Sequence, residues 1–115
     1  MTLRILNVND LLDLKTGGGT AERTFQMSRF LTLQGACCEV LTIDTGHLDA
    51  QRIEALQPAR VFVLPCLLRR FKIPRWRSAT IRRAVEKADI VHLMGHWSVL
   101  NVIVYLAARR AGKPY

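Results

Sequence analysis

Short apolar segments alternate with longer segments of helical spacing along the whole chain, and this alternation constrains the fold most. Runs rich in β-branched and aromatic residues predict four strands, at residues 3–8, 38–44, 60–65 and 89–94. Apolar residues spaced three and four apart predict helices at residues 20–34, 48–56, 74–88 and 99–111. Such alternation is typical of right-handed βαβ units. We therefore expect an α/β fold, a Rossmann-like parallel sheet with helices on both faces.

The last predicted helix and the tail after it indicate that this sheet extends further. Residues 99–111 are apolar nearly all round, which predicts burial on more than one side. Lys113-Pro114-Tyr115 has the character of an approach to another strand. A chain of 115 residues holds one domain at most. We therefore expect residues 1–115 to be part of a larger sheet domain.

Three consecutive glycines, Gly17, Gly18 and Gly19, stand between the first strand and the first helix. Glycine permits φ > 0 and lets a ligand come close to the main chain, and a helix start favours an anion. Two readings are open: contact with a phosphate or sugar, and a mobile turn without a ligand. The connection over residues 9–19 is longer than most βα loops, as functional loops often are. Thr16 or Thr20 is expected to cap the helix.

Polar side chains are expected to gather at the carboxyl edge of the sheet, where open parallel sheets bind ligands. Asp44 follows the second strand, and His96 and Trp97 follow the fourth. His96 is suited to bond a hydroxyl or to act as acid or base near neutral pH, and the alternative is an ordinary loop histidine. Trp97 is suited to stack on a sugar ring or to close the core. His92, within the strand, is expected to be a satisfied buried histidine.

A dinucleotide site is an alternative use of a glycine-rich turn after a first strand. It needs G-x-G-x-x-G directly after that strand, and an acidic residue about twenty residues further on. Asp44 is suitably placed, but the glycines come too late and with the wrong spacing. The sequence therefore argues against NAD or FAD, and no cofactor is expected.

Basic residues are concentrated in one segment of this chain, whose formal net charge is +8. Between residues 60 and 87 only Glu86 opposes the basic residues Arg60, Arg69, Arg70, Lys72, Arg75, Arg77, Arg82, Arg83 and Lys87. Such a segment favours an anionic partner, whether lipid headgroups, nucleic acid or an acidic glycan, and the alternative is a solvated face. No nucleic-acid motif accompanies the charge, so no nucleic-acid role is expected.

The cysteines and the most apolar segments of the chain indicate in which cellular compartment the protein is expected. Cys37, Cys38 and Cys66 fit neither a disulfide framework nor zinc-ligand spacing, so we expect reduced, buried thiols in a cytoplasmic protein without a metal site. The start of the chain reads directly as a strand rather than as a signal peptide. The most apolar window, residues 90–108, contains two histidines, an asparagine and a glycine, so no transmembrane helix is expected.

Six segments, in this order, resemble the N-terminal domain of family-4 (group 1) glycosyltransferases. They are Arg4-Ile5-Leu6, Gly17-Gly18-Gly19-Thr20-Ala21-Glu22-Arg23, Gly35 followed by Glu39-Val40, Ala88-Asp89-Ile90-Val91-His92, Gly95-His96-Trp97, and Ala107 to Tyr115. The resemblance covers essentially the whole chain, and it rests on the order and spacing of the motifs together.

This resemblance implies the GT-B fold, in which two Rossmann-like domains face each other across a cleft. In that family the N-terminal domain binds the acceptor and the C-terminal domain binds the nucleotide sugar. The sugar is transferred with retention and without an essential metal, and the nucleotide sugar is a substrate. Residues 1–115 would then be a partial N-terminal, acceptor-side domain, with the donor-binding C-terminal domain absent. The 115-residue chain alone is not expected to transfer sugar.

The resemblance also implies roles for particular residues. Gly17, Gly18 and Gly19 would approach the donor diphosphate or the reacting sugar. His92, His96 and Trp97 would lie on the acceptor side. Many relatives read His-x-His-Gly after the fourth strand, and here Met94 replaces the second histidine. Either the role of that histidine is lost in this chain, or it passes to His96, which is then the catalytic candidate.

Relatives with lipid-linked acceptors often dock on anionic membranes through a basic, aromatic surface of this domain. Here that surface would comprise Arg69, Arg70, Lys72, Arg75, Trp76, Arg77 and Arg83. The implied function is that of a bacterial-type enzyme of surface polysaccharide or glycolipid synthesis, cytoplasmic or peripheral on the inner face of the membrane. The alternative function is a non-catalytic Rossmann-like module that binds a nucleotide or an anionic partner.

Overall fold

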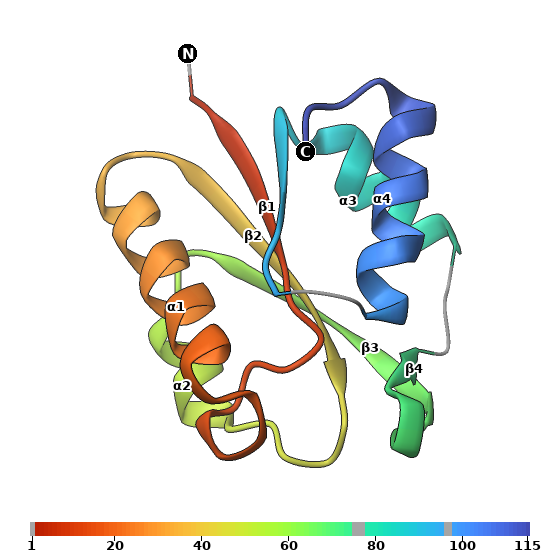
Figure 1. The fold of residues 1–115 in the computed structure, drawn as a ribbon. Coiled ribbons are helices and arrows are strands. Elements are labelled where there is room, and N and C mark those ends of the chain that lie inside the picture. The colour runs from red at the N-terminus through yellow and green to blue at the C-terminus, as the bar shows by residue number, and fades with distance from the viewer. Residues whose placement is uncertain (1, 75–77, 96–97) are drawn as a thin grey trace.

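The computed structural model describes residues 2–74, 78–95 and 98–115, with the backbone alone at positions 69 and 78 (Figure 1). Among these residues, five strands form one sheet in the spatial order β4-β3-β2-β1-β5. The parallel strands are β1 (Arg4–Val8), β2 (Cys37–Asp44), β3 (Arg60–Leu68) and β5 (Ile90–Leu93), and β4 (Ile73–Pro74) pairs antiparallel with β3. The helices are α1 (Leu14–Leu33), α2 (Ala50–Ala55), α3 (Ser78–Lys87) and α4 (Val99–Ala111), with a 3₁₀ turn η1 (Arg69–Phe71). The predicted α/β class, a mostly parallel Rossmann-like sheet, is confirmed.

Helices cover both faces of the sheet. Figure 1 shows α1 and α2 on one side of the strands and α3 and α4 on the other. Strand β1 contributes to both cores: Leu6 and Val8 are buried with α3 and α4, whereas Ile5 belongs to the cluster with α1 and α2. The chain leaves β1 toward β2 and β3 and later returns to β5 on the other side of β1. The boundary between β1 and β5 is therefore the topological switch point, where open α/β sheets bind ligands.

Helix α4 has its predicted bounds. Ser98 caps it, because its Oγ accepts a hydrogen bond from the Asn101 N–H at 3.0 Å. Gly112 ends it with φ 67, the left-handed conformation that glycine adopts without strain. Leu100, Val104 and Ala108 are buried against the sheet.

Helix α1 begins at Leu14 rather than at Thr20, so the predicted long loop is shorter. Asp13 is the cap: its carboxylate accepts from the Thr16 N–H at 2.9 Å and from the Thr16 hydroxyl at 2.6 Å. The expectation that Thr16 or Thr20 caps the helix is therefore wrong. Gly18, at φ 56 and ψ −139, interrupts the helix and divides a short first turn from the longer remainder. Gly35 follows the helix with φ 95, as predicted.

The basic connection after β3 also differs from the prediction. Strand β3 continues to Leu68, and residues 66–73 form its end, η1 and the start of β4. Pro74 pairs opposite Cys66 in β4, so the prediction that Pro74 opens a helix is wrong. A short edge strand suits proline, which has no N–H for a sheet ladder. The core-facing residues predicted for α3, including Ile81, Ala84 and Val85, are buried as expected.

Candidate functional site

The carboxyl ends of β1 and β5 bring two glycine-containing segments together at the switch point. Gly95, just after β5, has φ 88. A Cβ atom on Gly95 would lie 3.5 Å from Thr20 Cγ2 and 3.9 Å from Asn9 Oδ1. The end of β5 therefore lies against α1 just after its interruption, and the segment Gly17–Gly19, called here the glycine loop, borders the switch point.

The members of the glycine loop differ in what surrounds them. A Cβ on Gly17 would lie 2.5 Å from Ala21 Cβ and 3.0 Å from Leu11 Cβ, so Gly17 is required for packing. Among the residues that the structure describes, a Cβ on Gly18 or Gly19 would meet nothing within 4 Å beyond its own helix. No described residue therefore covers the main chain at Gly18 and Gly19, and only Gly18 of the three has a positive φ.

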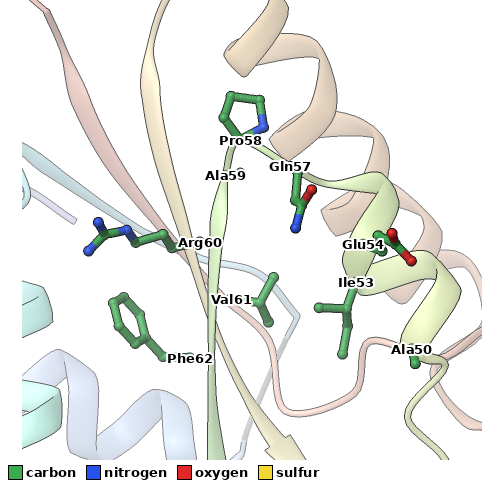
Figure 2. Close-up of a pocket in the computed structure, with 9 residues that line it drawn as sticks. All are labelled: Ala50, Ile53, Glu54, Gln57, Pro58, Ala59, Arg60, Val61 and Phe62. Atoms are coloured by element: carbon green, nitrogen blue, oxygen red, sulfur yellow. The ribbon is translucent and has the colours of Figure 1, made fainter.

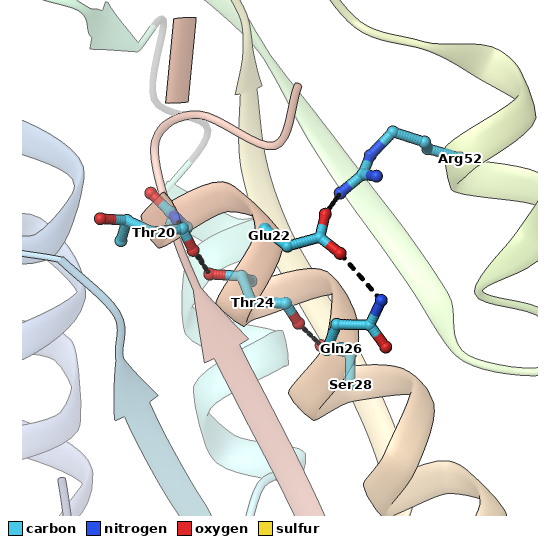
Figure 3. A network of polar contacts seen from close by, with 7 residues as sticks. Thr20, Glu22, Thr24, Gln26, Ser28 and Arg52 are labelled. Atoms are coloured by element: carbon cyan, nitrogen blue, oxygen red, sulfur yellow. Dashed lines mark hydrogen bonds and ion pairs between the residues drawn. The ribbon is translucent and has the colours of Figure 1, made fainter. Parts of the chain in front are cut away.

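A polar ladder on α1, comprising Thr20, Thr24, Ser28 and Thr32, runs away from the glycine loop. The hydroxyls of Thr24, Ser28 and Thr32 each donate to the carbonyl four residues earlier, at 2.9, 2.7 and 2.7 Å. Figure 3 shows the first two of these bonds along the buried side of α1. The ladder brings polar atoms to a helix face that packs on the sheet.

Two asparagines of the first strand region join β1 to this ladder. The Asn7 amide Nδ2 donates to Ser28 Oγ at 2.9 Å, and the Asn9 amide Nδ2 donates to Thr24 Oγ1 at 2.9 Å. Asn9 Oδ1 accepts from the Leu11 N–H at 3.3 Å. Both asparagines are buried. The sequence interpretation missed these residues, although their alternation along the strand was a usable signal.

An ion pair joins the start of α1 to α2. Glu22 accepts from Arg52 at 3.1 Å and from the Gln26 side chain at 2.8 Å (Figure 3). The hydrogen bond from Gln26 and that from Arg52 lower the pKa of Glu22. The Arg52 guanidinium also lies 4.1 Å from the centre of the Phe25 ring. These contacts fix the turn of α1 that follows the glycine loop.

Asp13 holds the turn that precedes the glycine loop. Burial alone would raise the pKa of Asp13, but the side-chain and backbone hydrogen bonds of Thr16 outweigh it and lower the pKa. Asp13 is therefore a buried, ionised cap. The glycine loop is anchored on both sides, by Asp13 before it and by Glu22 after it.

His92 lies within β5, level with Asn7 of β1, rather than at the carboxyl edge. It is half-buried, and burial together with the nearby Arg23 lowers its pKa. The neutral imidazole is the favoured form. His92 is therefore separated along the strand from the glycine loop, while Gly95 lies at it.

The remaining predicted site residues are distributed as follows. Asp44 is exposed at the carboxyl end of β2, and its carboxylate accepts from the Gly46 N–H at 2.9 Å. His96 and Trp97, the catalytic and acceptor-side candidates, lie outside the described residues, as do Arg75, Trp76 and Arg77.

The described part of the basic surface is interleaved with exposed apolar residues. Arg70 is exposed and lies 5.5 Å from the centre of the Phe71 ring, while Lys72 is half-buried with φ 52. Leu67 and Phe71 are 60% and 59% exposed, and the sequence interpretation did not single them out. Arg83 is exposed on α3, a separate element. For Arg69 only the backbone position, in η1, is described.

An open hollow of about 830 Å³ lies at the other end of the sheet, between α2 and the start of β3. Figure 2 shows Ile53 of α2 and Val61 of β3 pointing toward one another across it. Arg60, at the amino end of β3, and Pro58 also line it. None of the predicted site residues that the structure describes lines this hollow, and it lies away from the carboxyl edge.

The three cysteines are free thiols: Cys38 is buried, Cys66 is half-buried and Cys37 is exposed, so the expectation of buried thiols is wrong for Cys37. Burial raises the pKa of the Cys38 thiol. Within residues 2–74, 78–95 and 98–115, no group of His, Cys, Asp and Glu is arranged to hold a metal ion. Over the same residues, no helix has the length and apolar character that crossing a membrane requires.

Comparisons with known protein families, with curated proteins and with solved structures gave no match to this chain.

Proposed function

We propose that this chain is the N-terminal, acceptor-side part of a retaining glycosyltransferase of the GT-B class. Such an enzyme moves a sugar from a nucleotide sugar to a glycan or a lipid-linked acceptor. The donor would be held by a second domain facing the carboxyl edge of the sheet. On this proposal, residues 1–115 alone do not transfer sugar.

One observation supports the proposal most: the open glycine loop borders the switch point between β1 and β5. No residue in the described part of the chain covers the main chain at Gly18 and Gly19, and Gly95 lies against Thr20 directly beside them. A carboxyl edge at a switch point is where ligands bind in α/β sheets. The polar ladder and the Asp13 and Glu22 anchors hold this loop in place.

The chemistry that this loop would supply is electrostatic. When a glycosyl bond to a nucleoside diphosphate breaks, the leaving diphosphate gains negative charge. Backbone N–H groups at a helix start, held beforehand, stabilise such charge without a metal or a dedicated side chain. His96 and Trp97 would contact the acceptor, with His96 as the candidate for proton transfer, and His92 would support them from within β5. An anionic membrane surface remains the proposed docking partner for a lipid-linked acceptor.

The substitution Gly19→Ala tests the proposal. The added methyl group meets nothing within 4 Å beyond its own helix, and alanine favours helix by about 0.5–1 kcal/mol, so the fold is expected to keep its stability. The readout is the amide NMR shifts of Gly17, Gly18 and Gly95 on addition of uridine diphosphate glucose, with a separately purified nucleotide-sugar-binding domain present. We expect shifts in the unsubstituted chain, and their loss in the Gly19→Ala variant.

Leu33→Ala, at the far end of α1 and 74% exposed, is the matched control and should leave the shifts intact. Shifts that persist in Gly19→Ala would contradict a role for the glycine loop. Tight binding of the nucleotide by this chain alone would instead favour the alternative, a non-catalytic nucleotide-binding module. Sugar transfer by the purified 115-residue chain would contradict the proposal that a second domain must hold the donor.

A further inference from the structure

An apolar groove of about 530 Å³ lies between α3 and α4, the two helices on the side of the sheet opposite α1 (Figure 1). Ile81 of α3, which is 2% exposed, and the half-buried Ile103 and Ala107 of α4 line its inner part. Leu106, which is 50% exposed, lines its outer part. Val102 is 48% exposed and lies four residues before Leu106, on the same side of α4. The apolar surface therefore continues beyond the groove.

The groove is separate from the flank of α4 along which the chain continues. Tyr105 packs edge-on against Tyr115, with ring centroids 4.9 Å apart, so residues 113–115 lie beside that flank. At about 100° per residue, Tyr105 lies about 160° around the helix from Ile103. Helix α1, which carries the glycine loop, lies on the other face of the sheet. A ligand in the groove would therefore leave both the glycine loop and residues 113–115 free.

Arginines border the groove from both helices. Arg82 of α3 and Arg110 of α4 line it, and both are exposed. Glu86 is the one acidic residue among the described residues of the groove, and its carboxylate lies 3.9 Å from the Arg82 guanidinium. Both of these side chains are more than half exposed, so their ion pair is weak. Within the part of the chain that the structure describes, Arg110 has no ion-pair partner. The groove therefore has an apolar inner part between positively charged borders, which favours an acidic partner.

The placement of the two arginines favours several acidic groups over one anionic head group. Helix α3 ends just before β5 begins, and α4 begins just after β5 ends, so both helices run from the carboxyl edge to the amino edge. Arg82 is near the middle of α3, whereas Arg110 is in the last turn of α4. The two arginines therefore lie on opposite borders and at different points along the groove. An amphipathic helix offers acidic side chains on both sides of its apolar stripe, at more than one point along its length.

We propose that the groove between α3 and α4 binds an amphipathic α-helix of a partner protein, in which acidic residues flank the apolar stripe on both sides. The stripe packs against Ile103 and Leu106, and its acidic flanks meet Arg82 and Arg110. Amphipathic helices bind apolar grooves through residues spaced three and four apart. This interaction goes beyond sugar transfer, and it stands whether or not the protein is a glycosyltransferase.

The test uses a synthetic peptide of three Glu-Leu-Ala-Gln-Leu-Glu-Ala repeats, with fluorescein at its N-terminus. In a helix its leucines form one stripe, and its glutamates flank that stripe on both sides. A matched peptide carries lysine in place of every glutamate. Fluorescence anisotropy during titration with the purified chain measures the affinity for each peptide. Because the chain has a net charge of +8, variants of the chain must separate binding in the groove from general attraction.

Arg82→Glu should weaken binding of the glutamate peptide about fivefold or more, because an attraction becomes a repulsion. Lys87→Glu is the matched control, since it makes the same change of charge at an exposed position of α3 about 140° from Arg82. This control should keep the affinity within about twofold. Leu106→Asp removes the apolar contact at an exposed position and should weaken binding about tenfold. Equal weakening by Arg82→Glu and Lys87→Glu would overturn the proposal, because the peptide would then recognise net charge alone.

Reversed charges test the pairing directly. The double variant Arg82→Glu with Arg110→Glu should bind the lysine peptide about fivefold or more tightly than the unsubstituted chain does. The double variant Arg29→Glu with Lys87→Glu has the same net charge, at exposed positions away from the groove, and should not gain this affinity. Equal gains in both double variants would overturn the proposal. So would self-association of the unsubstituted chain that Leu106→Asp abolishes in sedimentation velocity, because a second copy would then be the occupant.

Discussion

Strand β1 meets the helices on its two faces differently: by apolar packing on one face, and by packing with added hydrogen bonds on the other. Toward α3 and α4, Leu6 and Val8 pack into an apolar core. Toward α1, Asn7 donates a hydrogen bond to Ser28, and Asn9, just after the strand, donates one to Thr24. Apolar burial is not directional, whereas a hydrogen bond fixes which atoms face each other. The helix that carries the glycine loop is therefore fixed at one position along β1 by hydrogen bonds in addition to its apolar cluster, whereas the described residues of β1 meet α3 and α4 through apolar packing.

The largest expected effect comes from the apolar face. Leu100 on α4 is completely buried, so Leu100→Ala should lower the free energy of unfolding by about 2–5 kcal/mol, because burial is lost and a cavity forms. Urea unfolding of the purified chain measures this. Leu106→Ala on the same helix, where the side chain is 50% exposed, should change stability by no more than about 0.5 kcal/mol. Similar losses in both variants would show that α4 does not hold the apolar face as described.

A smaller effect is expected for the hydrogen bonds between β1 and α1, and there the effects of two substitutions should not add. Ser28→Ala leaves the buried Asn7 amide without its acceptor and should cost about 1–3 kcal/mol. Replacing both partners, as Asn7→Leu with Ser28→Ala, should cost less than the sum of the two single changes, because no unpaired donor remains. Unfolding free energies of the four proteins give the coupling. Strict additivity would mean that this bond does not couple the two elements.

The smallest effect concerns the Asp13 cap and depends on pH. Asp13→Ala should cost about 0.5–2 kcal/mol at pH 7. The pKa of Asp13 in the folded chain lies below its ordinary value of 3.8, so the ionised form is the one that stabilises. This contribution is fully present above pH 3.8 and is lost as pH falls through the folded-state pKa. The stability difference between wild type and Asp13→Ala, measured by urea unfolding, should therefore be constant above pH 3.8 and shrink over the range below it. A difference that stays constant over that range would rule out the ionised cap.

A comparison of α4 with α1 shows which helix bounds can be predicted from the sequence and which cannot. The bounds of α4 follow from local signals alone, since Ser98 and Gly112 are strong start and stop residues around an apolar run. The start of α1 was missed because three glycines predicted a loop, whereas the Asp13 cap supports a helical turn before them. Strand β4 has two residues, and its pairing with the end of β3 is a tertiary contact that no period in the sequence reveals.

The candidate site could also be predicted in part, because the topology of a parallel sheet follows from the alternation of strands and helices. The parallel topology placed the glycine loop and Gly95 at one edge of the sheet, and the strand alternation is enough to predict this. The need for glycine at position 17 comes from the closeness of Leu11 and Ala21. These contacts exist only in the folded chain and cannot be predicted from the sequence pattern. The pairing of Asn7 and Asn9 with α1 depends on the relative placement of two elements, which single-element patterns do not contain.

Each hydroxyl of the polar ladder that donates does so to a carbonyl of its own helix, so its proton is not available to β1. The Ser28 hydroxyl uses its one proton on the Thr24 carbonyl, so toward β1 it offers lone pairs only. Asn7 must therefore turn its NH₂ group toward Ser28, and its buried Oδ1 has no hydrogen-bond partner among the described residues. Aspartate has nearly the same shape as asparagine, but it would set a carboxylate oxygen against an oxygen with no proton to give. Position 7 therefore favours asparagine over aspartate, although the two side chains have nearly the same size. The reason is the hydroxyl of Ser28, twenty-one residues further along the chain, which has already donated its proton within α1.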